Sequence, residues 1–141
     1  MSKTTPAAAL GTLRRMADSG DLDPFCRDQG VQLLVAFGST ADPLLAEHAR
    51  DLDLAASFDA SGDGDPVQLI NALVDVLHID EIDVMDLDRA GPVAREQALV
   101  GTVGLYEKEA GILIGMRDVA MLRRMDTGWF RQLDLRLMAA G

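Results

Sequence analysis

Val35-Ala36-Phe37-Gly38-Ser39 is an apolar run that ends in two small residues, and Asp51-Leu52-Asp53 follows it after residues 40–50. The dense apolar residues before Gly38 predict a buried strand over residues 31–37 that ends in a tight turn. In the stretch 50–57, charged and apolar residues alternate until Ala55-Ala56, which predicts a second strand with Asp51 and Asp53 on one face. Aspartate is unfavourable in strands, so two aspartates on one strand face indicate a functional role.

A third strand is predicted over residues 82–87, where two acidic residues, Asp83 and Asp86, lie in an apolar run. Because these two residues have opposite parity, only one of them can face the site. Asp83 is the candidate for the site, and Asp86 is a rival that also suits a solvated or capping position at the strand end. Three converging carboxylates repel one another unless a cation lies between them. We therefore expect Asp51, Asp53 and Asp83 to hold Mg²⁺ or Mn²⁺ for chemistry on a nucleotide.

Apolar residues at helical spacing predict the helices around these strands. The predicted helices cover residues 6–16, a short stretch ending near residue 30, a segment containing residues 44–48, and residues 67–78, 93–99 and 116–140. A helix that begins just after Gly38-Ser39 presents free backbone N–H groups to a phosphate. Gly38 lets the backbone approach the phosphates, and the hydroxyls of Ser39 and Thr40 can donate to them.

The last predicted helix is amphipathic. Its apolar stripe is expected to cover the core as a lid, and it contains Val119, Leu122, Met125, Trp129, Leu133 and Leu137. Other apolar residues fall off this stripe and are expected to be available to a partner protein; these are Met121, Leu135 and Met138. The exposed methionines and the pair Trp129-Phe130 are further candidate anchors for that partner.

The length and composition predict one soluble domain over residues 1–141, with the core motifs in 31–107 and a helical segment in 113–140. We expect an α/β (α+β) fold in which helices pack on a small mixed β-sheet and further helices flank it at both termini. The N-terminus lacks the apolar region of a signal peptide, and no apolar run reaches membrane-spanning length. A cytoplasmic protein is therefore expected.

The formal net charge is −10, from 23 acidic and 13 basic residues. This charge disfavours nucleic acid as the main ligand, because such binding depends on neutralising phosphates with Lys and Arg. A basic protein, or a nucleotide accompanied by Mg²⁺, fits the charge better. The only cysteine is Cys26, which excludes an internal disulfide and a cysteine-built zinc site and is expected to be a small buried hydrophobe.

Other motifs give weaker signals. The stretch Asp59-x-Ser61-x-Asp63-Gly64-Asp65 is similar to the start of an EF-hand loop, but Ile70 occupies the position of the bidentate Glu, so a solvated turn is expected. The two histidines, His48 and His78, have no Cys or His at metal-ligand spacing and are expected at the surface or at helix ends. No Walker-type motif and no nucleophile elbow occurs in the sequence.

The ordered set of an apolar strand, Gly38-Ser39, Asp51-Leu52-Asp53 and Asp83 resembles the nucleotidyltransferase superfamily that includes DNA polymerase beta. The resemblance is greatest to its minimal nucleotidyltransferase (MNT) branch and covers residues 31–107, which end in a Leu105-Tyr106 pair similar to that family's. Many members carry Arg and Gly just after Gly-Ser, where they grip the phosphates. Here residues 40–44 contain an acidic residue and no basic one. Phosphate binding would then depend on the metal, on backbone N–H groups and on hydroxyls.

The resemblance implies the nucleotidyltransferase fold and Mg²⁺-dependent transfer of a nucleoside monophosphate, AMP from ATP or the equivalent from another NTP, with pyrophosphate leaving. It implies that Asp51 and Asp53 hold Mg²⁺ against the triphosphate, while Asp83 binds a second ion or acts as a base. It also implies an antitoxin that adds AMP to a hydroxyl of a HEPN-type ribonuclease toxin. Two alternatives remain open, namely transfer to a small molecule and a non-catalytic binding module of the same fold that blocks a partner.

Overall fold

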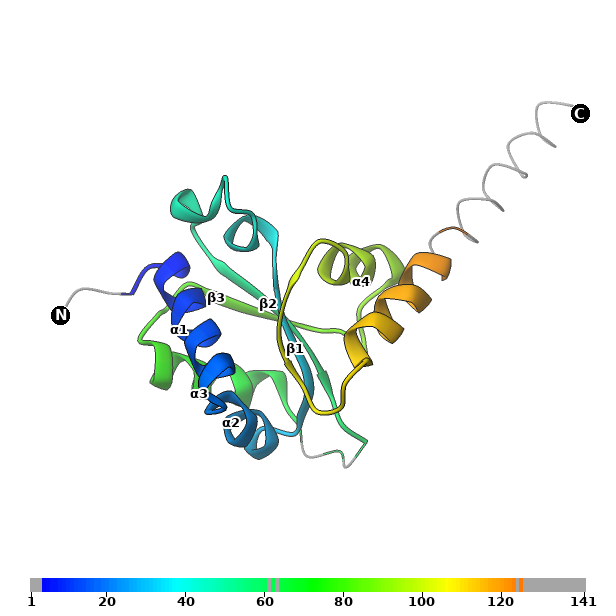
Figure 1. Cartoon of the computed structure of the whole chain (residues 1–141), viewed down its shortest axis with the longest axis horizontal. Coiled ribbons are helices and arrows are strands. Elements are labelled where there is room, and N and C mark those ends of the chain that lie inside the picture. Colours follow the sequence, from blue (N-terminus) through cyan, green and yellow to red (C-terminus); the bar gives the residue numbers. More distant parts are fainter. Residues whose placement is uncertain (1–3, 61, 63, 124, 126–141) are drawn as a thin grey trace, which may run out of the picture.

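The computed structural model describes residues 4–60, 62, 64–123 and 125, and its centre is a sheet flanked by helices on both faces (Figure 1). The strand order in this mixed sheet is β3-β2-β1-β4. β1 pairs antiparallel with both β2 and β4, while β2 pairs parallel with β3. The bounds of the strands are β1 Val31–Phe37, β2 Leu52–Phe58, β3 Ile82–Asp86 and β4 Val103–Glu107.

Three helices pack on one face of the sheet, and α4 packs on the other together with a helix over residues 112–123. The bounds of the numbered helices are α1 Pro6–Ser19, α2 Leu22–Asp28, α3 Pro66–Leu77 and α4 Pro92–Leu99. None of the described helices has both the length and the apolar character needed to cross a bilayer.

Capping residues in the sequence fix where α1 and α3 begin. The Thr5 hydroxyl accepts a hydrogen bond from the Ala8 N–H at 3.2 Å, and Asp65 accepts one from the Val67 N–H at 2.9 Å. A proline follows each cap, at a position where a missing N–H costs nothing. α1 ends at Gly20, which takes the left-handed conformation with φ +88°.

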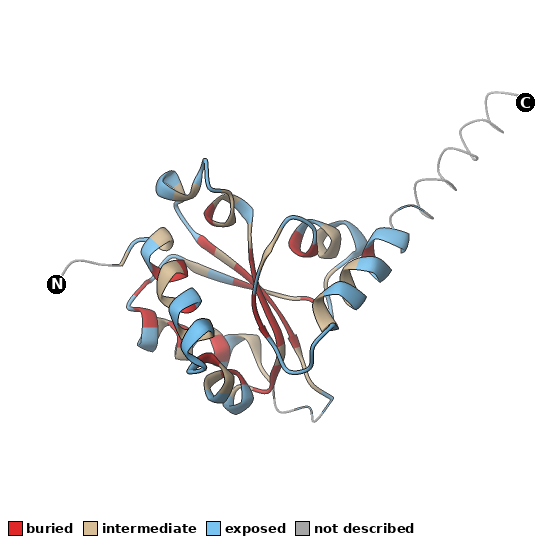
Figure 2. Ribbon diagram, in the orientation of Figure 1, coloured by how far each residue is buried: buried red, intermediate tan, exposed pale blue. Residues whose placement is uncertain are grey.

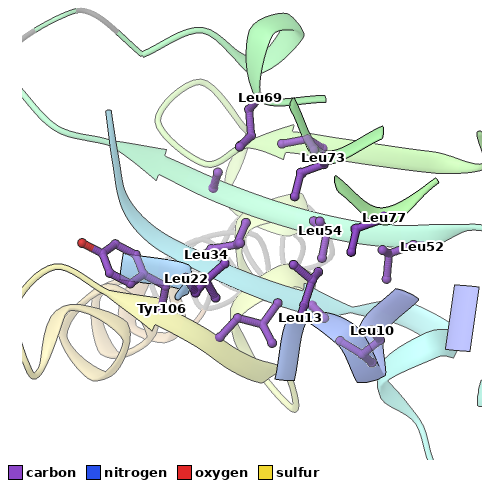
Figure 3. Close-up of a cluster of buried hydrophobic side chains, with 14 of the residues drawn as sticks. Leu10, Leu13, Leu22, Leu34, Leu52, Leu54, Leu69, Leu73, Leu77 and Tyr106 are labelled. Atoms are coloured by element: carbon purple, nitrogen blue, oxygen red, sulfur yellow. The ribbon is translucent and has the colours of Figure 1, made fainter. Parts of the chain in front are cut away.

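Leucine dominates the core between the sheet and helices α1 to α3 (Figure 3). Leu52 and Leu54 of β2 are fully buried on this face, and so is Leu34 of β1. The alternation of side chains sends the intervening residues of each strand to the other face. There Val35 and Ala55 meet α4 and the helix over 112–123, while Gly104 of β4 leaves room for Leu113.

Local structure departs from the sequence-based expectation in two places. The segment after Gly38-Ser39 forms two 3₁₀ turns, η1 Gly38–Ala41 and η2 Ala46–His48, instead of the expected helix. Pro43 lies between them, has no N–H to donate and disfavours a helical residue before it, so a longer helix does not form. Residues 103–107, for which the sequence pattern indicates no element type, form the edge strand β4.

The expected core-facing stripe of the last helix is also wrong where the structure describes it. Val119, Leu122 and Met125 are exposed, whereas Ala120 is the residue buried against the sheet. Figure 2 shows that the described part of this helix is largely exposed. Met121, which is predicted off the stripe, is exposed as well. The other expected anchors and stripe residues lie outside the described residues: Trp129, Phe130, Leu133, Leu135, Leu137 and Met138.

Candidate functional site

Strand register brings two of the three predicted aspartates side by side. Asp53 of β2 pairs with Phe37 of β1 on one side and with Asp83 of β3 on the other. Register partners share a face of the sheet, and adjacent strands lie about 4.8 Å apart. The three residues therefore form a row across the sheet, on the face that also carries α4. Asp53 is half-buried in this row, and Asp83 is exposed.

Asp51 lies one residue before β2 and is exposed. Its backbone carbonyl oxygen accepts a hydrogen bond from the Thr40 hydroxyl at 2.8 Å, which ties the η1 turn to the start of β2. Thr40 is 2% exposed, and its only hydroxyl proton is committed to this bond. Thr40 therefore fixes the turn in place. Contact of the Thr40 and Ser39 hydroxyls with a phosphate stays a prediction.

Gly38 is the residue that lets the turn pass over Asp53. Its φ is +74°, in the left-handed region where a side chain is strained. A Cβ at this position would lie 2.8 Å from Oδ2 of Asp53, which is closer than real Cβ contacts. The glycine is therefore required by both conformation and space, and it brings the backbone of the Gly-Ser turn against a carboxylate of the site.

The electrostatics of the site are set by unbalanced negative charge. Burial raises the pKa of Asp53, and repulsion from Asp51 and Asp83 raises it further. The described part of the chain provides none of these three carboxylates with an ion-pair partner. A group of carboxylate oxygens that lacks positive charge fits a hard divalent cation. Among the described residues, however, no three His, Cys, Asp or Glu side chains already stand at metal-holding distances.

Asp86, the rival of Asp83 for the site, has the capping role that the sequence offered as its alternative. It pairs with Ala56 in the parallel register, three residues further along β3 from Asp83. Its Oδ1 accepts a hydrogen bond from the Asp88 N–H at 3.0 Å, and its Oδ2 lies 3.8 Å from Nε of Arg89. Asp86 therefore closes the turn after β3, and of the two candidates only Asp83 lies beside Asp53.

The remaining candidates have structural roles. Burial raises the pKa of the Cys26 thiol to about 12, which agrees with the expected inert hydrophobe. His78 is exposed and ends α3 in the left-handed conformation, and His48 is exposed in η2. Asp59 lies 3.5 Å from Nζ of Lys108, while residues 61 and 63 of the predicted solvated turn lie outside the described residues.

A polar network at the far end of β2 is absent from the sequence-based predictions. Ser57 is fully buried, donates to Oδ1 of Asp88 at 2.8 Å and accepts from Nε2 of Gln32 at 2.8 Å. Asp88 also accepts from the Phe58 N–H at 3.0 Å. The network joins residues as distant in the chain as Gln32 and Asp88, so no local pattern marks it.

Two buried polar atoms on the side of the sheet that carries α4 have no hydrogen-bond partner in the described part of the chain. They are Oγ1 of Thr102 and Nε of Arg95. Thr102 directly precedes β4, whose first residue Val103 pairs with Ala36 of β1. Neither residue stands out in the sequence.

The sequence matches no known protein family and no curated protein, but the fold matches solved structures. A toxin–antitoxin complex with AMP-PNP has a TM-score of 0.62 and 19% identity, over 83% of this chain and 94% of that chain. A tri-AMPylated Shewanella oneidensis HEPN toxin in complex with MNT antitoxin has a TM-score of 0.59 and 18% identity, over 87% and 96%. The MntA–HepT toxin–antitoxin structure has a TM-score of 0.56 and 19% identity, over 83% and 92%. The chain therefore has the fold of MNT antitoxins, the nucleotidyltransferase fold.

Proposed function

We propose that this protein is a nucleotidyltransferase antitoxin that transfers AMP from ATP to a hydroxyl of a HEPN-type protein partner. The observation that carries the proposal is the row in which Asp53 and Asp83 adjoin on neighbouring strands, with the Gly38 turn directly against Asp53. Support also comes from fold neighbours that include a complex with AMP-PNP and an AMPylated HEPN toxin bound to an MNT antitoxin.

The residues of the site divide into three roles. Asp51 and Asp53 would hold Mg²⁺ or Mn²⁺, which when bound supplies positive charge at the triphosphate and lowers the pKa of the attacking hydroxyl. Asp83 accepts the proton of that hydroxyl or shares in holding the ion. The Gly38-Ser39 turn faces the phosphates with backbone N–H groups and the Ser39 hydroxyl.

The transfer is a displacement at the α-phosphorus of ATP. The acceptor oxygen forms a bond to this phosphorus while the bond from it to the bridging oxygen of pyrophosphate breaks. The proton of the acceptor passes to a carboxylate of the site, and pyrophosphate leaves. Asp53 contributes most to holding the cation when it is ionised, because only the ionised carboxylate is a ligand to a hard cation.

Charge supports a protein acceptor over RNA. The chain carries a net charge of −10, and Asp51 and Asp83 of the site are exposed. A polyanion would be repelled from such a surface, whereas a basic protein would be steered toward it at an increased association rate.

The experiment is a label-transfer assay with a HEPN-type protein offered as the acceptor. Label should move to that protein from ATP labelled at the α-phosphate and stay behind when the label is at the γ-phosphate. Asp53→Asn should abolish transfer, while Asp86→Asn, a matched change on the same pair of strands, should retain it. A tight complex that acquires no label would support the binding module instead, and labelled RNA would overturn the charge argument.

A further inference from the structure

The exposed apolar side chains of this protein gather on the two helices that cover the aspartate face of the sheet. These helices are α4 and the helix over residues 112–123, which pack against the same core cluster (Figure 1). Seven of the eleven large apolar side chains that are exposed in the described part of the chain belong to α4, to its cap or to residues 112–125. The other four divide between α3 and the segment between η1 and η2. The aspartate side of the sheet is therefore the side with an apolar surface.

The helix over residues 112–123 is apolar on two opposite sides. Its inner side packs on the sheet through Ile112, Leu113, Met116 and Ala120. Its outer side is exposed and has apolar residues at helical spacing, namely Ile114, Met121, Leu122 and Met125. Leu122 is 60% exposed and Met125 is 69% exposed. One apolar side is enough to attach a surface helix to its own core, so a second one indicates an interface.

The surface of α4 has the same character. Val93 and Val100 are exposed one helical repeat apart, and a cavity of about 270 Å³ lies beside them, lined also by Glu96 and Gln97. In both helices an acidic residue lies between the apolar ones. This residue is Glu96 on α4 and Asp118 on the other helix. The two exposed stripes together form what we call the outer apolar face.

The outer apolar face begins beside the candidate site. Val100 caps α4, and a short link leads from it into β4 at Val103. Val103 pairs with Ala36, and the next residue of β1, Phe37, pairs with Asp53. Val100 therefore lies at the end of the sheet that carries the aspartate row. A protein that brings a hydroxyl to Asp53 over this face of the sheet meets the end of α4.

We propose that the outer apolar face docks a helix of the protein acceptor, an inference that rests on the proposed function. The docked helix presents an apolar stripe to the stripes of α4 and of residues 112–125, and the cavity beside Val93 and Val100 receives one of its side chains. It carries a Lys or Arg opposite Asp118, because docking takes this exposed carboxylate out of water and a buried carboxylate requires a cationic partner.

Charge disfavours a second copy of the chain as the occupant. A two-fold contact brings the same patch of both copies together. Asp118 and Glu96 of one copy would then meet the same acidic residues of the other, and like charges across an interface are unfavourable. An acceptor with a basic residue in its apolar stripe meets no such repulsion.

The first test compares Leu122→Ser with Val67→Ser in the intact protein, with a HEPN-type protein as the probe. Val67 is a matched control because it is 63% exposed but lies on α3, which packs on the opposite face of the sheet. Leu122→Ser should raise the Kd of the complex and the KM for the acceptor about tenfold. Val67→Ser should leave both unchanged, and neither variant should alter the Kd for ATP.

The second test separates local charge from net charge. Asp118→Lys and Asp75→Lys change the net charge equally, but Asp75 is exposed on α3. Asp118→Lys should raise the Kd of the complex about tenfold or more, because it places a cation against the basic residue of the docked helix. Asp75→Lys should leave the Kd nearly unchanged. Equal increases for the two variants would assign the effect to long-range steering and overturn the docking surface.

The outcomes distinguish this inference from the proposed function. Unchanged Kd and KM for Leu122→Ser, or no complex with the wild type, would overturn the docking surface. A complex that Leu122→Ser weakens but that acquires no label would overturn the transferase and leave the docking surface standing. Two other results would also overturn the proposal. A lower melting temperature for Leu122→Ser than for Val67→Ser would mean that the chain itself covers this face, and a wild-type dimer that Leu122→Ser dissociates in light scattering would assign the face to self-association.

Discussion

Asp53 of β2 and Asp83 of β3 are direct register neighbours on one face of a parallel strand pair, and no basic side chain of the described residues forms an ion pair with either. Like charges on adjacent strands destabilise a sheet. Burial, together with the charges of Asp51 and Asp83, raises the pKa of Asp53. The fold therefore carries an electrostatic cost at this position, and binding of a cation would offset it.

Asp53→Asn should stabilise the metal-free protein at neutral pH and abolish its activity. Since the pKa of Asp53 is raised by folding, the folded state holds more protons than the unfolded state between the ordinary aspartate pKa and the raised value. The contribution of Asp53 to the free energy of unfolding therefore falls as pH rises through that window. Asn does not ionise, so the variant does not lose stability in this way. The rate of transfer should drop by more than about a hundredfold. Loss of a residue that only orients a metal ligand already lowers metal affinity or activity about 10–100-fold.

Urea unfolding of both proteins, from about pH 3 to about pH 7, measures this difference because the range spans the titration of an aspartate. The stability of the wild type relative to Asp53→Asn should decline as the pH rises. Superimposable pH profiles for the two proteins would contradict the assignment.

Gly38→Ala should destabilise the fold by more than the left-handed conformation alone explains. A non-glycine residue at positive φ costs about 1–2 kcal/mol, and the new Cβ also meets Asp53 Oδ2 at 2.8 Å. Gly20→Ala is the matched control, since its φ is +88° and no atom lies within 4 Å of its Cβ. Chemical denaturation should show the larger loss for Gly38→Ala, and the excess should disappear when Asp53→Ala is added. Equal losses at the two glycines would mean that the turn does not press on the carboxylate.

Ser57→Ala should cost about 1–3 kcal/mol of stability, because it removes two hydrogen bonds of a fully buried hydroxyl, one of them to the Asp88 carboxylate. Ser57 joins Gln32 to Asp88 at the end of β2 remote from the aspartate row. Ser19→Ala removes hydrogen bonds of an exposed serine and should change stability by less than about 0.5 kcal/mol. Thermal denaturation compares the two, and the Kd for ATP should be unchanged in both variants. Lost ATP binding in folded Ser57→Ala would place this network in the site.

Mg²⁺ or Mn²⁺ should raise the melting temperature, and ATP added with the metal should raise it further. A ligand that binds only the folded state stabilises it by about 2.7 kcal/mol at a hundred times its Kd. Asp53→Asn should lose this response, while Asp86→Asn, whose carboxylate closes a turn, should keep it. A wild-type melt that is unchanged by millimolar metal and nucleotide would contradict a cation site at these carboxylates.

The sequence predicts strands β1, β2 and β3 because dense apolar residues and period-two alternation report directly on burial and face. It cannot supply the pairing of Asp53 with Asp83, since this depends on strand order and register between segments that are distant in the chain. Parity shows that Asp83 and Asp86 cannot both face the site, and the choice of Asp83 comes from the family resemblance. The Ser57 network joins segments that no local pattern connects.

Two errors show where pattern reading stops. Helical spacing predicts an apolar stripe over residues 116–140 but not what that stripe faces, and among its described residues Leu122 is exposed while Ala120 is buried. After Gly38, apolar residues at 44–45 favour a helix, but Pro43 interrupts a continuous one and the segment forms two 3₁₀ turns. Leu44 and Leu45 are exposed there. In both places apolar side chains that fit a helical pattern lie on the surface.

The central claim is transfer of AMP to a protein, and intact-mass spectrometry tests it most directly. The wild-type protein is incubated with ATP, Mg²⁺ and a HEPN-type protein as the acceptor, with Asp53→Asn in a parallel reaction. We predict that the partner gains mass in AMP-sized steps with the wild type and none with the variant. A partner that binds tightly but keeps its original mass in both reactions would contradict this claim.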